Sequence, residues 1–538
     1  MISDRDLKQL LLSVEKPGRY SGGEYGAIIK NDALLRFVIS YPDLYEIGMS
    51  NLAVRILYDT INAVEGASCE RVFAPFFDFE DALRKRNLSL FSLETSTPIR
   101  DFDIIGFSVG YELCFTNICA MLELSEIPVC TDERGESDPI VIGGGPAVNN
   151  PAPFGRVLDA VFIGEAEGVL PSLMADLVDM KKRGACREDL IERILEEPCF
   201  WSEKKTGRVQ RAVFTDFRNS KHVSHLVPSI SVVQGHGISE IMRGCPNGCR
   251  FCHAGMYYRP VREKELSIIL DEVAELVNTV GHREITLASL SSGDFCLLPE
   301  LMTILNSLYR DSRISFALPS LKIDSFTLDI LKQLSEVRKS GLTFAVETPF
   351  AGCQIGINKE VPVEKTIAIL MEAKSLGWKS AKFYFMVGLP VSKGTDEVAG
   401  IIAYLEEVRV ATNLSFNVNV GSFIPKPFTP FQWDRQLTEA EALDRIMGIK
   451  RGLDKRYYKV GYHSPFTSVL EGLISRGGKE VFPVVMDAYR RGARFDAWDD
   501  YLNVEAWRAS FAAAGFDVEE YAVRERSLDE VLPWDSIS

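Results

Sequence analysis

The sequence of 538 residues lacks several features that define whole classes of protein. It has no apolar run of the roughly 18 residues that a membrane span requires. Its first residues carry early acidic side chains and no clear apolar segment, so a secretory signal is not expected. Basic charge is also scarce, because 60 lysines and arginines face 75 acidic residues for a net charge of −15. A broad duplex-binding surface is therefore not expected either.

Cysteine is present, but it does not follow a disulfide pattern. Eleven cysteines, an odd number, are scattered over a long chain without a secretory segment. We therefore expect free thiols and a reducing, cytoplasmic location. Hydrophobic and charged contents of 46% and 25% are those of ordinary globular proteins. A chain of this length is too long for one hydrophobic core, so two or three domains are expected.

Strand and helix patterns alternate through residues 1–200. Alternation of this kind predicts a doubly wound, Rossmann-like parallel sheet whose ligands bind at the carboxyl ends of the strands. Residues 201–235 are irregular and polar, and we interpret them as a connector. The strand candidates are 34–42, 101–109, 139–148 and the start of 160–180, and the helix candidates are 49–64, 115–127 and the rest of 160–180.

Residues 236–430 repeat a strand and helix pattern six times. The repeats predict a partial (β/α)6 barrel of the TIM type, with its site on the carboxyl face of the strands. Between the first two strands, residues 266–280 follow the spacing of an amphipathic helix. Residues 431–538 show no evident strand and predict a C-terminal helical cap, with helix candidates at 440–455, 480–493 and 504–515. The strand candidates are 237–244, 284–290, 314–320, 342–347, 381–388 and 415–425.

Three cysteines lie close together in "RGCPNGCRFCHAG", directly after the first strand candidate of the predicted barrel. Cys245, Cys249 and Cys252 supply three soft thiolates on one loop. A zinc site with His253 as fourth ligand is one interpretation, but structural zinc usually pairs two separated short motifs. A [4Fe–4S] cluster needs four ligands, so three cysteines would leave one iron open for a substrate or cofactor. We favour this second interpretation.

The spacing of Cys245, Cys249 and Cys252, with Phe251 before the last cysteine, resembles the signature of the radical S-adenosylmethionine (SAM) superfamily. The resemblance implies a cluster whose open iron binds the amino and carboxylate groups of SAM. An electron from the cluster then cleaves SAM and releases a 5′-deoxyadenosyl radical. The resemblance also implies that Phe251 lies against the adenine, with ordinary core packing as the alternative.

Turns after the later strands correspond to positions where the superfamily binds SAM. In the turn "SSGDF", glycine allows close approach and Asp294 can accept hydrogen bonds from the methionine ammonium, although an ordinary turn is the alternative. After strand candidate 342–347 the superfamily often has a Glu-Ala-Gly-Ser-like run, whereas this chain reads "ETPFAGC". Lys426 is expected to point into the site. The resemblance assigns SAM binding to Ser292, Gly293, Asp294, Ser320, Glu347, Gly388 and Ile424.

The strand ends of the first unit resemble a degenerate cobalamin-binding domain. Asp43 and Tyr45 in "DLYEIG", Ser108 in "SVG", and Gly143 and Gly144 in "GGG" occur in the order that this family shows. Tyr45 stands where the family has its cobalt-ligating histidine, and a neutral phenol is a poor ligand at neutral pH. We therefore expect either cobalamin bound without a histidine ligand or a domain that keeps only the fold.

Runs such as "PKPFTPFQW" and "LEGLISRGG" make the whole chain similar to an uncharacterised cobalamin-binding-domain-type family of radical SAM proteins. The expected function is an enzyme that cleaves SAM and then methylates a substrate or inserts sulfur into it. The alternatives are an electron-transfer protein and a zinc-stabilised binding module. Cys296 and Cys353 are expected to be small packing residues, with a second cluster or a radical relay as the alternative. The expected partners are SAM, a reductant such as flavodoxin or ferredoxin, and an RNA, ribosomal component, peptide or small metabolite as substrate, with no membrane.

Overall fold

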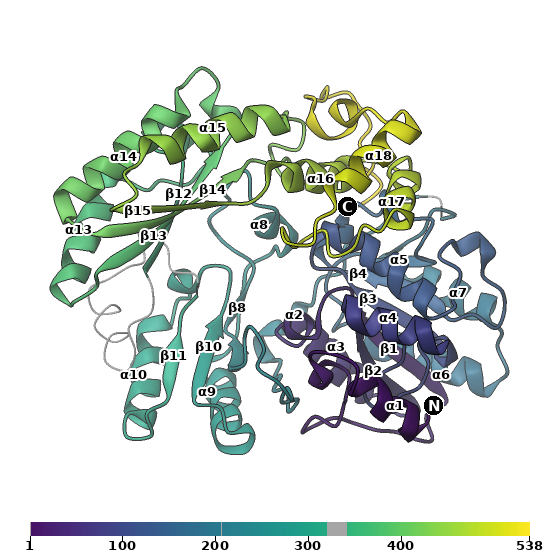
Figure 1. The fold of residues 1–538 in the computed structure, drawn as a ribbon. Helices are drawn as coiled ribbons and strands as arrows, with labels where there is room; N and C mark the ends of the chain where they lie inside the picture. The colour runs from purple at the N-terminus through teal and green to yellow at the C-terminus, as the bar shows by residue number, and fades with distance from the viewer. Residues whose placement is uncertain (1, 206, 320–341) are drawn as a thin grey trace.

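A six-stranded sheet forms the N-terminal part of the chain (Figure 1), in a computed structural model that describes residues 2–205, 207–319 and 342–538. The strand order is β2-β1-β3-β4-β5-β6, in which the first five strands are parallel and β6 is antiparallel. This order reverses between β1 and β3, and ligands of such sheets bind beyond the strand ends at that point. The strands are β1 (Leu35–Tyr41), β2 (Ala67–Phe73), β3 (Ile104–Ser108), β4 (Ile140–Gly144), β5 (Ala160–Phe162) and β6 (Phe200–Trp201).

Helices cover both faces of this sheet. Side chains alternate along each strand, so that Val38 and Val141 belong to one core while Phe37 and Ile142 belong to the other. The first core contains α1, α4 and α5, and the second contains α3, α6 and α7. The helices are α1 (Asp4–Leu11), α2 (Tyr45–Gly48), α3 (Leu52–Asn62), α4 (Phe77–Arg86), α5 (Phe115–Leu124), α6 (Leu170–Lys182) and α7 (Arg187–Glu196).

The predicted strands of this part are confirmed, but β2 is a strand that the sequence analysis misses. Its sequence, "ASCERVF", mixes charged and apolar residues, yet every residue of β2 is buried. Arg71 pairs with Glu94 at 2.6 Å and with Glu24 at 3.1 Å. These partners compensate the charge inside the core, so a charged sequence can occupy a buried strand.

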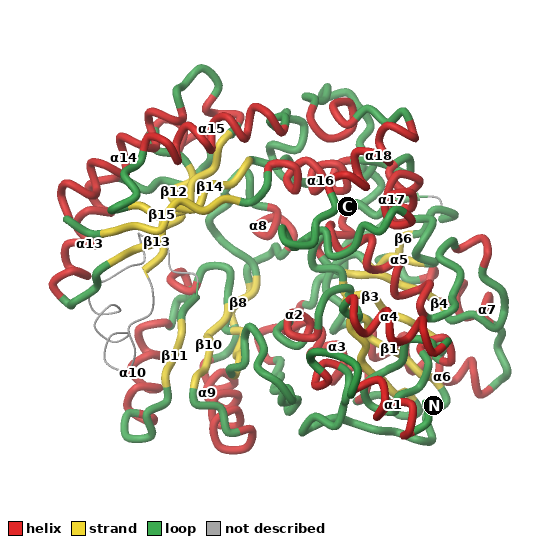
Figure 2. The backbone as a smooth tube through the Cα atoms, viewed as in Figure 1, coloured by secondary structure: helices red, strands yellow, loops and turns green. Residues whose placement is uncertain are grey.

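Two further parallel sheets form the second part of the chain (Figure 2). One has the strand order β11-β10-β7, and the other has the order β12-β13-β14-β15. A short antiparallel pair, β8 with β9, follows β7. All six strand predictions between 236 and 430 are confirmed. The strands are β7 (Gly237–Glu240), β8 (Met242–Arg243), β9 (Arg262–Glu263), β10 (Glu284–Ala288), β11 (Ser315–Ala317), β12 (Leu342–Glu347), β13 (Ser380–Val387), β14 (Ser415–Ser422) and β15 (Tyr458–Tyr462).

The strand β15 corrects the expectation that residues 431–538 contain no strand. It pairs in parallel with β14, so the described part of this region contributes a seventh strand to the two sheets. Only Tyr458 of its five residues is buried. An edge strand of this kind carries no continuous apolar run, and the sequence therefore gives little indication of it.

The helices of the second part lie along the two sheets. The amphipathic helix predicted for 266–280 is confirmed as α9 and a following π-helical turn, which bury Ile269, Val273 and Leu276. No helix in the described ranges is both long and apolar enough to cross a membrane. The helices are α8 (His253–Tyr257), α9 (Leu266–Glu275), α10 (Leu298–Tyr309), α12 (Ala351–Gly356), α13 (Val363–Ser375), α14 (Glu397–Thr412) and α15 (Glu439–Gly452).

The last three helices pack against the N-terminal sheet. They are α16 (Pro465–Arg476), α17 (Val481–Arg490) and α18 (Val504–Ala514), and Figure 1 shows α17 beside α5. Leu470, Val485 and Trp507 share one core with residues of α5. The predicted helices at 440–455, 480–493 and 504–515 are confirmed, whereas α16 is not among the predictions. The C-terminal helices thus extend the core of the first sheet.

Asp496 joins these helices to α5, and replacing it should destabilise the fold. Its carboxylate accepts hydrogen bonds from the Thr116 hydroxyl at 2.6 Å and from the Trp507 indole at 2.9 Å. Asp496→Ala leaves both donors buried without their partner, which should lower the free energy of unfolding by about 2–4 kcal/mol. Chemical denaturation followed by circular dichroism measures the difference.

The pH dependence of Asp496→Asn provides a second readout. Burial raises the pKa of Asp496 to about 6 in the folded protein, from an ordinary value of 3.8. The folded state therefore holds this proton more tightly, and the carboxyl makes the wild type lose stability as the pH rises from about 4 to 6. Asp496→Asn removes this loss, so its stability relative to wild type should be higher at pH 8 than at pH 4. An equal difference in stability between Asp496→Asn and wild type at pH 4 and pH 8 would contradict a raised pKa for Asp496.

Candidate functional site

The three-cysteine loop runs from β8 to α8, at the carboxyl end of the first strand of the second part. Gly244 has a φ of +86°, and a side chain there would come within 2.8 Å of two backbone carbonyl oxygens of the segment that leads to β9. Only glycine therefore allows the chain to turn here. The turn leaves Cys245, Cys249 and Cys252 partly exposed.

The donor chemistry of the loop fits an iron–sulfur cluster. The Cys245 Sγ accepts the Asn247 side-chain N–H at 3.4 Å, and the Cys252 Sγ accepts the Gly255 backbone N–H at 3.3 Å. Among the described residues, no group of three or more cysteine, histidine or acidic side chains is arranged so that it could hold a metal ion. The fit therefore rests on three thiols that share one short loop, since thiolates are the ligands that such clusters prefer.

The turn "SSGDF" lies directly beside the cysteine loop. The Asp294 Oδ2 accepts the Asn247 side-chain N–H at 2.7 Å and the Ser291 hydroxyl at 2.6 Å. Ser292 is fully buried, and its hydroxyl lies 2.9 Å from that of Ser289. Of the residues predicted to hold the methionine amino group, Asp294 is thus in hydrogen-bonded contact with the loop.

Two further predicted residues, Glu347 and Phe251, are linked through Lys359. Glu347 ends β12 with a φ of +65°, an uncommon conformation for a residue other than glycine. Its carboxylate pairs with the Lys359 ammonium at 2.7 Å, and the same ammonium lies 5.8 Å from the centre of the Phe251 ring. Phe251 also packs against the buried side chains of Leu389 and Phe423.

Gly388 and Ile424 lie at the ends of β13 and β14. Gly388 has a φ of +82°, and a side chain there would lie 2.5 Å from Leu437. Its N–H already donates to the Glu397 carboxylate at 3.0 Å. Ile424 is half-buried in the segment after β14. Ser320 falls outside the residues that the structure describes.

Lys426 does not point toward the SAM residues, which corrects the expectation. Its ammonium pairs with Glu112 at 2.6 Å and with Glu471 at 2.7 Å, at the junction of the first sheet and α16. Burial and then the charge of Lys426 lower the pKa of the nearby His253 to about 3. The His253 Nε2 lies 3.3 Å from the Asn149 Nδ2.

A cavity of about 570 Å³ lies between the N-terminal sheet and the strands around the cysteine loop. The predicted residues Ser108, Gly143 and Gly144 line it from the ends of β3 and β4. Phe37 and Gly106 line it at β1 and β3, where the strand order reverses. A ligand is expected at this place in a sheet of this topology. The opposite wall includes Met242, Tyr257, Ala288 and Ser289 from the second part.

Asp43 and Tyr45 are not among the residues that line this cavity, in contrast to the expectation. The Asp43 carboxylate accepts the indole N–H of Trp498 at 3.0 Å. The Tyr45 hydroxyl accepts the Ser229 N–H at 3.1 Å, and burial raises the pKa of this phenol. Both side chains are buried, and these hydrogen bonds hold the loop after β1 in place.

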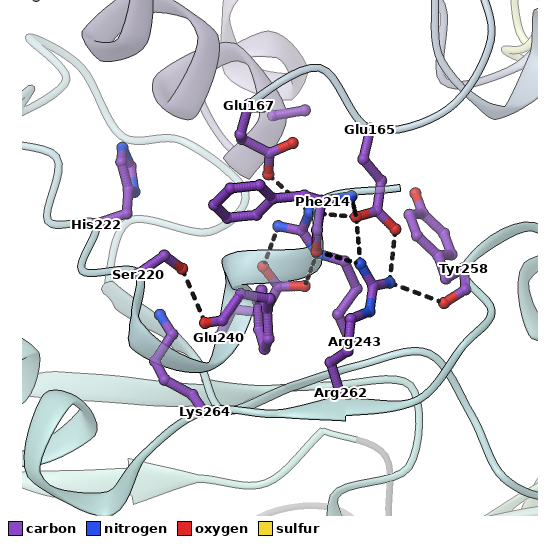
Figure 3. Close-up of polar contacts among 12 residues, drawn as sticks. Glu165, Glu167, Phe214, Ser220, His222, Glu240, Arg243, Tyr258, Arg262 and Lys264 are labelled. Carbon is purple, nitrogen blue, oxygen red and sulfur yellow. Dashed lines mark hydrogen bonds and ion pairs between the residues drawn. The ribbon is translucent and has the colours of Figure 1, made fainter. Parts of the chain in front are cut away.

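The sequence analysis misses a cluster of charged residues around Arg243 (Figure 3). Glu167, Glu240 and Arg243 of this cluster line both this cavity and a second one of about 320 Å³. The carboxylate of Glu165, after β5, accepts hydrogen bonds from both terminal nitrogens of Arg262 at 2.6 Å and from one nitrogen of Arg243 at 3.2 Å. Arg243 also pairs with Glu167 at 2.7 Å and with Glu240 at 2.8 Å. The two carboxylates of "GEAEG", at a strand end, are the feature of the sequence that indicates this charged cluster.

Two family models match the chain. One, described as the N-terminal part of radical SAM proteins, matches residues 53–201. The other, of the radical SAM superfamily, matches residues 239–399 and therefore includes the three-cysteine loop. Together they match more than half of the chain. The chain belongs to the radical SAM superfamily.

Relatives of this radical SAM protein match it over most of its length. The uncharacterised protein MJ0966 of Methanocaldococcus jannaschii is 25% identical over 462 residues, which are 84% of this chain and 90% of the relative. The radical SAM methyltransferase TsrM of Kitasatospora setae, solved with tryptophan and a SAM analogue, has a TM-score of 0.55 at 12% identity. Its structure with cobalamin and a [4Fe–4S] cluster has a TM-score of 0.54 at 13% identity. Both TsrM matches cover 89% of this chain and 99% of TsrM, and they indicate a shared fold.

Glu165→Gln should destabilise this radical SAM protein, because it leaves the buried Arg243 and the half-buried Arg262 with less compensating charge. Breaking a buried ion pair on one side costs about 3–5 kcal/mol, whereas an exposed pair is worth less than about 1 kcal/mol. Glu126→Gln, which removes the exposed partner of Arg100, is the matched control. Denaturant unfolding of both variants gives the comparison, and equal losses would contradict the structural role of Glu165.

The loss of folding stability caused by Glu165→Gln should also depend on pH. Burial raises the pKa of Glu165, but its hydrogen bonds with Arg262 and the charge of Arg243 outweigh burial and lower the pKa below the ordinary 4.5. The stability from this carboxylate is therefore fully present above about pH 4.5 and is lost as the pH falls through the lower folded-state pKa. The difference in the free energy of unfolding between wild type and Glu165→Gln should be constant between pH 6 and 8 and should decrease in acid.

Proposed function

We propose that this radical SAM enzyme holds a [4Fe–4S] cluster on Cys245, Cys249 and Cys252 and cleaves SAM reductively to modify a substrate. The observation that carries the proposal is the contact between the cysteine loop and the turn "SSGDF". Asn247 joins the two through its 2.7 Å hydrogen bond to Asp294. An acceptor for the methionine ammonium therefore lies beside three thiols, and three thiols leave one iron of a cube without a protein ligand.

The proposed roles of the other residues follow from their contacts. The cluster, when bound, supplies the electron that cleaves a carbon–sulfur bond of SAM. Phe251 offers a partly buried ring for the adenine to stack on, and Glu347 offers a carboxylate, held by Lys359, to the ribose hydroxyls. Gly388 has its N–H committed to Glu397, so it contributes backbone surface and no donor. Ile424 contributes backbone groups near the adenine.

Cobalamin is the second proposed cofactor, bound in the larger cavity. The cavity lies where a doubly wound sheet binds ligands, and Gly143 and Gly144 leave its wall free of side chains. Ser289 lines the same cavity and contacts Ser292 of the turn that we assign to SAM. Because Tyr45 is buried behind the cavity, cobalamin would bind without a ligand from this position.

In this proposal, residues 1–200 form the doubly wound cofactor-binding domain and residues 236–430 form a partial barrel from the two smaller sheets. Residues 201–235 connect them, and residues 431–538 form the helical C-terminal region. The reaction is the transfer of a methyl group to an unreactive position, with sulfur insertion as the second candidate. The description of TsrM as a methyltransferase favours methyl transfer. A flavodoxin or ferredoxin supplies the electron.

The proposal predicts that the anaerobically reconstituted, reduced protein releases 5′-deoxyadenosine from SAM. The Cys245→Ala, Cys249→Ala, Cys252→Ala triple variant should lose the cluster and this product, because the cluster loses its protein ligands. Cys186→Ala, which removes an exposed cysteine of α7's N-terminus, is the control and should retain both. Iron, sulfide and zinc analysis and chromatography of the product are the measurements.

Each remaining outcome of this experiment excludes a part of the proposal. A cluster without any SAM cleavage would favour an electron-transfer protein. Zinc in place of iron would favour a binding module. An undiminished cluster in the triple variant would overturn the assignment of the three cysteines.

Gly144→Leu should lower the affinity for hydroxocobalamin at least about tenfold while leaving the iron content unchanged. A Cβ at Gly144 would meet Phe162 at 3.5 Å, an ordinary contact, so the variant should fold with its side chain in the cavity. Filling space that a ligand needs costs about 1–3 kcal/mol. Gly135→Leu, in an exposed turn of the same part, is the matched control. Spectrophotometric titration measures the affinity, and equal affinities of the two variants would place cobalamin elsewhere.

A further inference from the structure

Asn247 is the residue that connects the cysteine loop to the turn "SSGDF". It lies between Cys245 and Cys249, and its side-chain nitrogen is within hydrogen-bond distance of three groups. These are the Cys245 Sγ at 3.4 Å, the Ser291 hydroxyl at 3.2 Å and the Asp294 Oδ2 at 2.7 Å. The side chain thus contacts a proposed iron ligand and a proposed SAM ligand at the same time.

The backbone of Asn247 is held from the other side of the loop. The Asn358 side-chain nitrogen, after α12, donates to the carbonyl oxygens of Asn247 at 2.7 Å and of Gly248 at 3.2 Å. Gly248 has a φ of +66°, a left-handed conformation that favours glycine. The loop is therefore fixed by Asn358 through its backbone and by Asn247 through its side chain, and the two functions are separable by mutation.

The contact with Asp294 has a consequence for ligand binding. Among the described residues, the hydrogen bonds to this carboxylate from Asn247 and Ser291 both end on Oδ2. Two donors on one oxygen restrain the carboxylate, and within the described ranges no hydrogen bond is assigned to Oδ1. A carboxylate with one oxygen held by the protein and one directed to a ligand is well suited to receive an ammonium group.

The contact with Cys245 has a consequence for electron transfer. A hydrogen bond to a ligand sulfur withdraws electron density from it and stabilises the reduced state of a cluster. Loss of this donor should therefore make the cluster harder to reduce. A residue that only stabilised the loop would not change the reduction potential of a fully assembled cluster in one direction.

We propose that Asn247 is a positioning residue that orients Asp294 for the SAM ammonium and, through the Cys245 sulfur, raises the reduction potential of the cluster. This inference rests on the proposed function, because it takes Cys245 as an iron ligand and Asp294 as a SAM ligand. The side-chain amide of Asn247 thus affects both SAM binding and the reduction potential of the cluster.

The experiment compares Asn247→Ala and the isosteric Asn247→Asp with Asn358→Gly in the full-length, reconstituted protein. Glycine is chosen at position 358 because Asn358 has a φ of +57°. For each protein, SAM affinity is measured by equilibrium dialysis and the midpoint potential by a redox titration followed by electron paramagnetic resonance. Both Asn247 variants should bind SAM at least about tenfold more weakly, since a hydrogen bond to a charged group is lost. Both should also titrate at a more negative potential, whereas Asn358→Gly should match wild type within about twofold in affinity.

Asn247→Asp keeps the size of the side chain, so it remains informative if Asn247→Ala assembles poorly. Unchanged SAM affinity and unchanged potential in an assembled Asn247 variant would overturn the inference alone. The same changes in Asn358→Gly would also overturn it, because they would show that only loop stability matters. A wild-type protein that assembles no cluster would instead contradict the proposed function.

Discussion

The ion pairs of Glu165 with Arg243 and Arg262 join the two parts of the chain, and the rest of the site depends on them. Glu165 follows the last parallel strand of the first sheet, while Arg243 and Arg262 belong to the two short strands that flank the cysteine loop. Burying a carboxylate without a charged partner costs several kcal/mol. The burial of Glu165 therefore favours its pairing with the two arginines. Their contacts at 2.6–3.2 Å hold the cysteine loop against the carboxyl edge of the sheet. The large cavity consequently opens beside that loop.

This arrangement places one turn between the cysteine loop and the large cavity. The turn "SSGDF" contacts the cysteine loop through Asp294 and reaches the cavity through the pair of Ser292 with Ser289. On our proposal, SAM and cobalamin would therefore contact the same short turn from opposite sides. A methyl group would then have a short path between the two cofactors.

The sequence predicts most strands and the cysteine loop because both have local signals. Apolar runs mark β1, β3 and β4 and six later strands, β7 and β10 to β14, and the three closely spaced cysteines identify their own loop. The edge strand β15 lacks such a run, and three other failures have a different cause, since they depend on partners elsewhere in the chain. Arg71 makes β2 acceptable in a core only through Glu24 and Glu94. Asp43 is committed to Trp498 and Lys426 to Glu112, at separations of 455 and 314 residues. No local pattern reports such contacts.

On our proposal, the three-cysteine loop leaves one iron free to bind SAM. Electron–nuclear double resonance of the reduced protein, with SAM labelled with ¹⁵N in its amino group, can detect this binding. We expect a ¹⁵N coupling that appears on addition of labelled SAM and is absent with unlabelled SAM. A reduced cluster that shows no such coupling at saturating SAM would contradict the proposal.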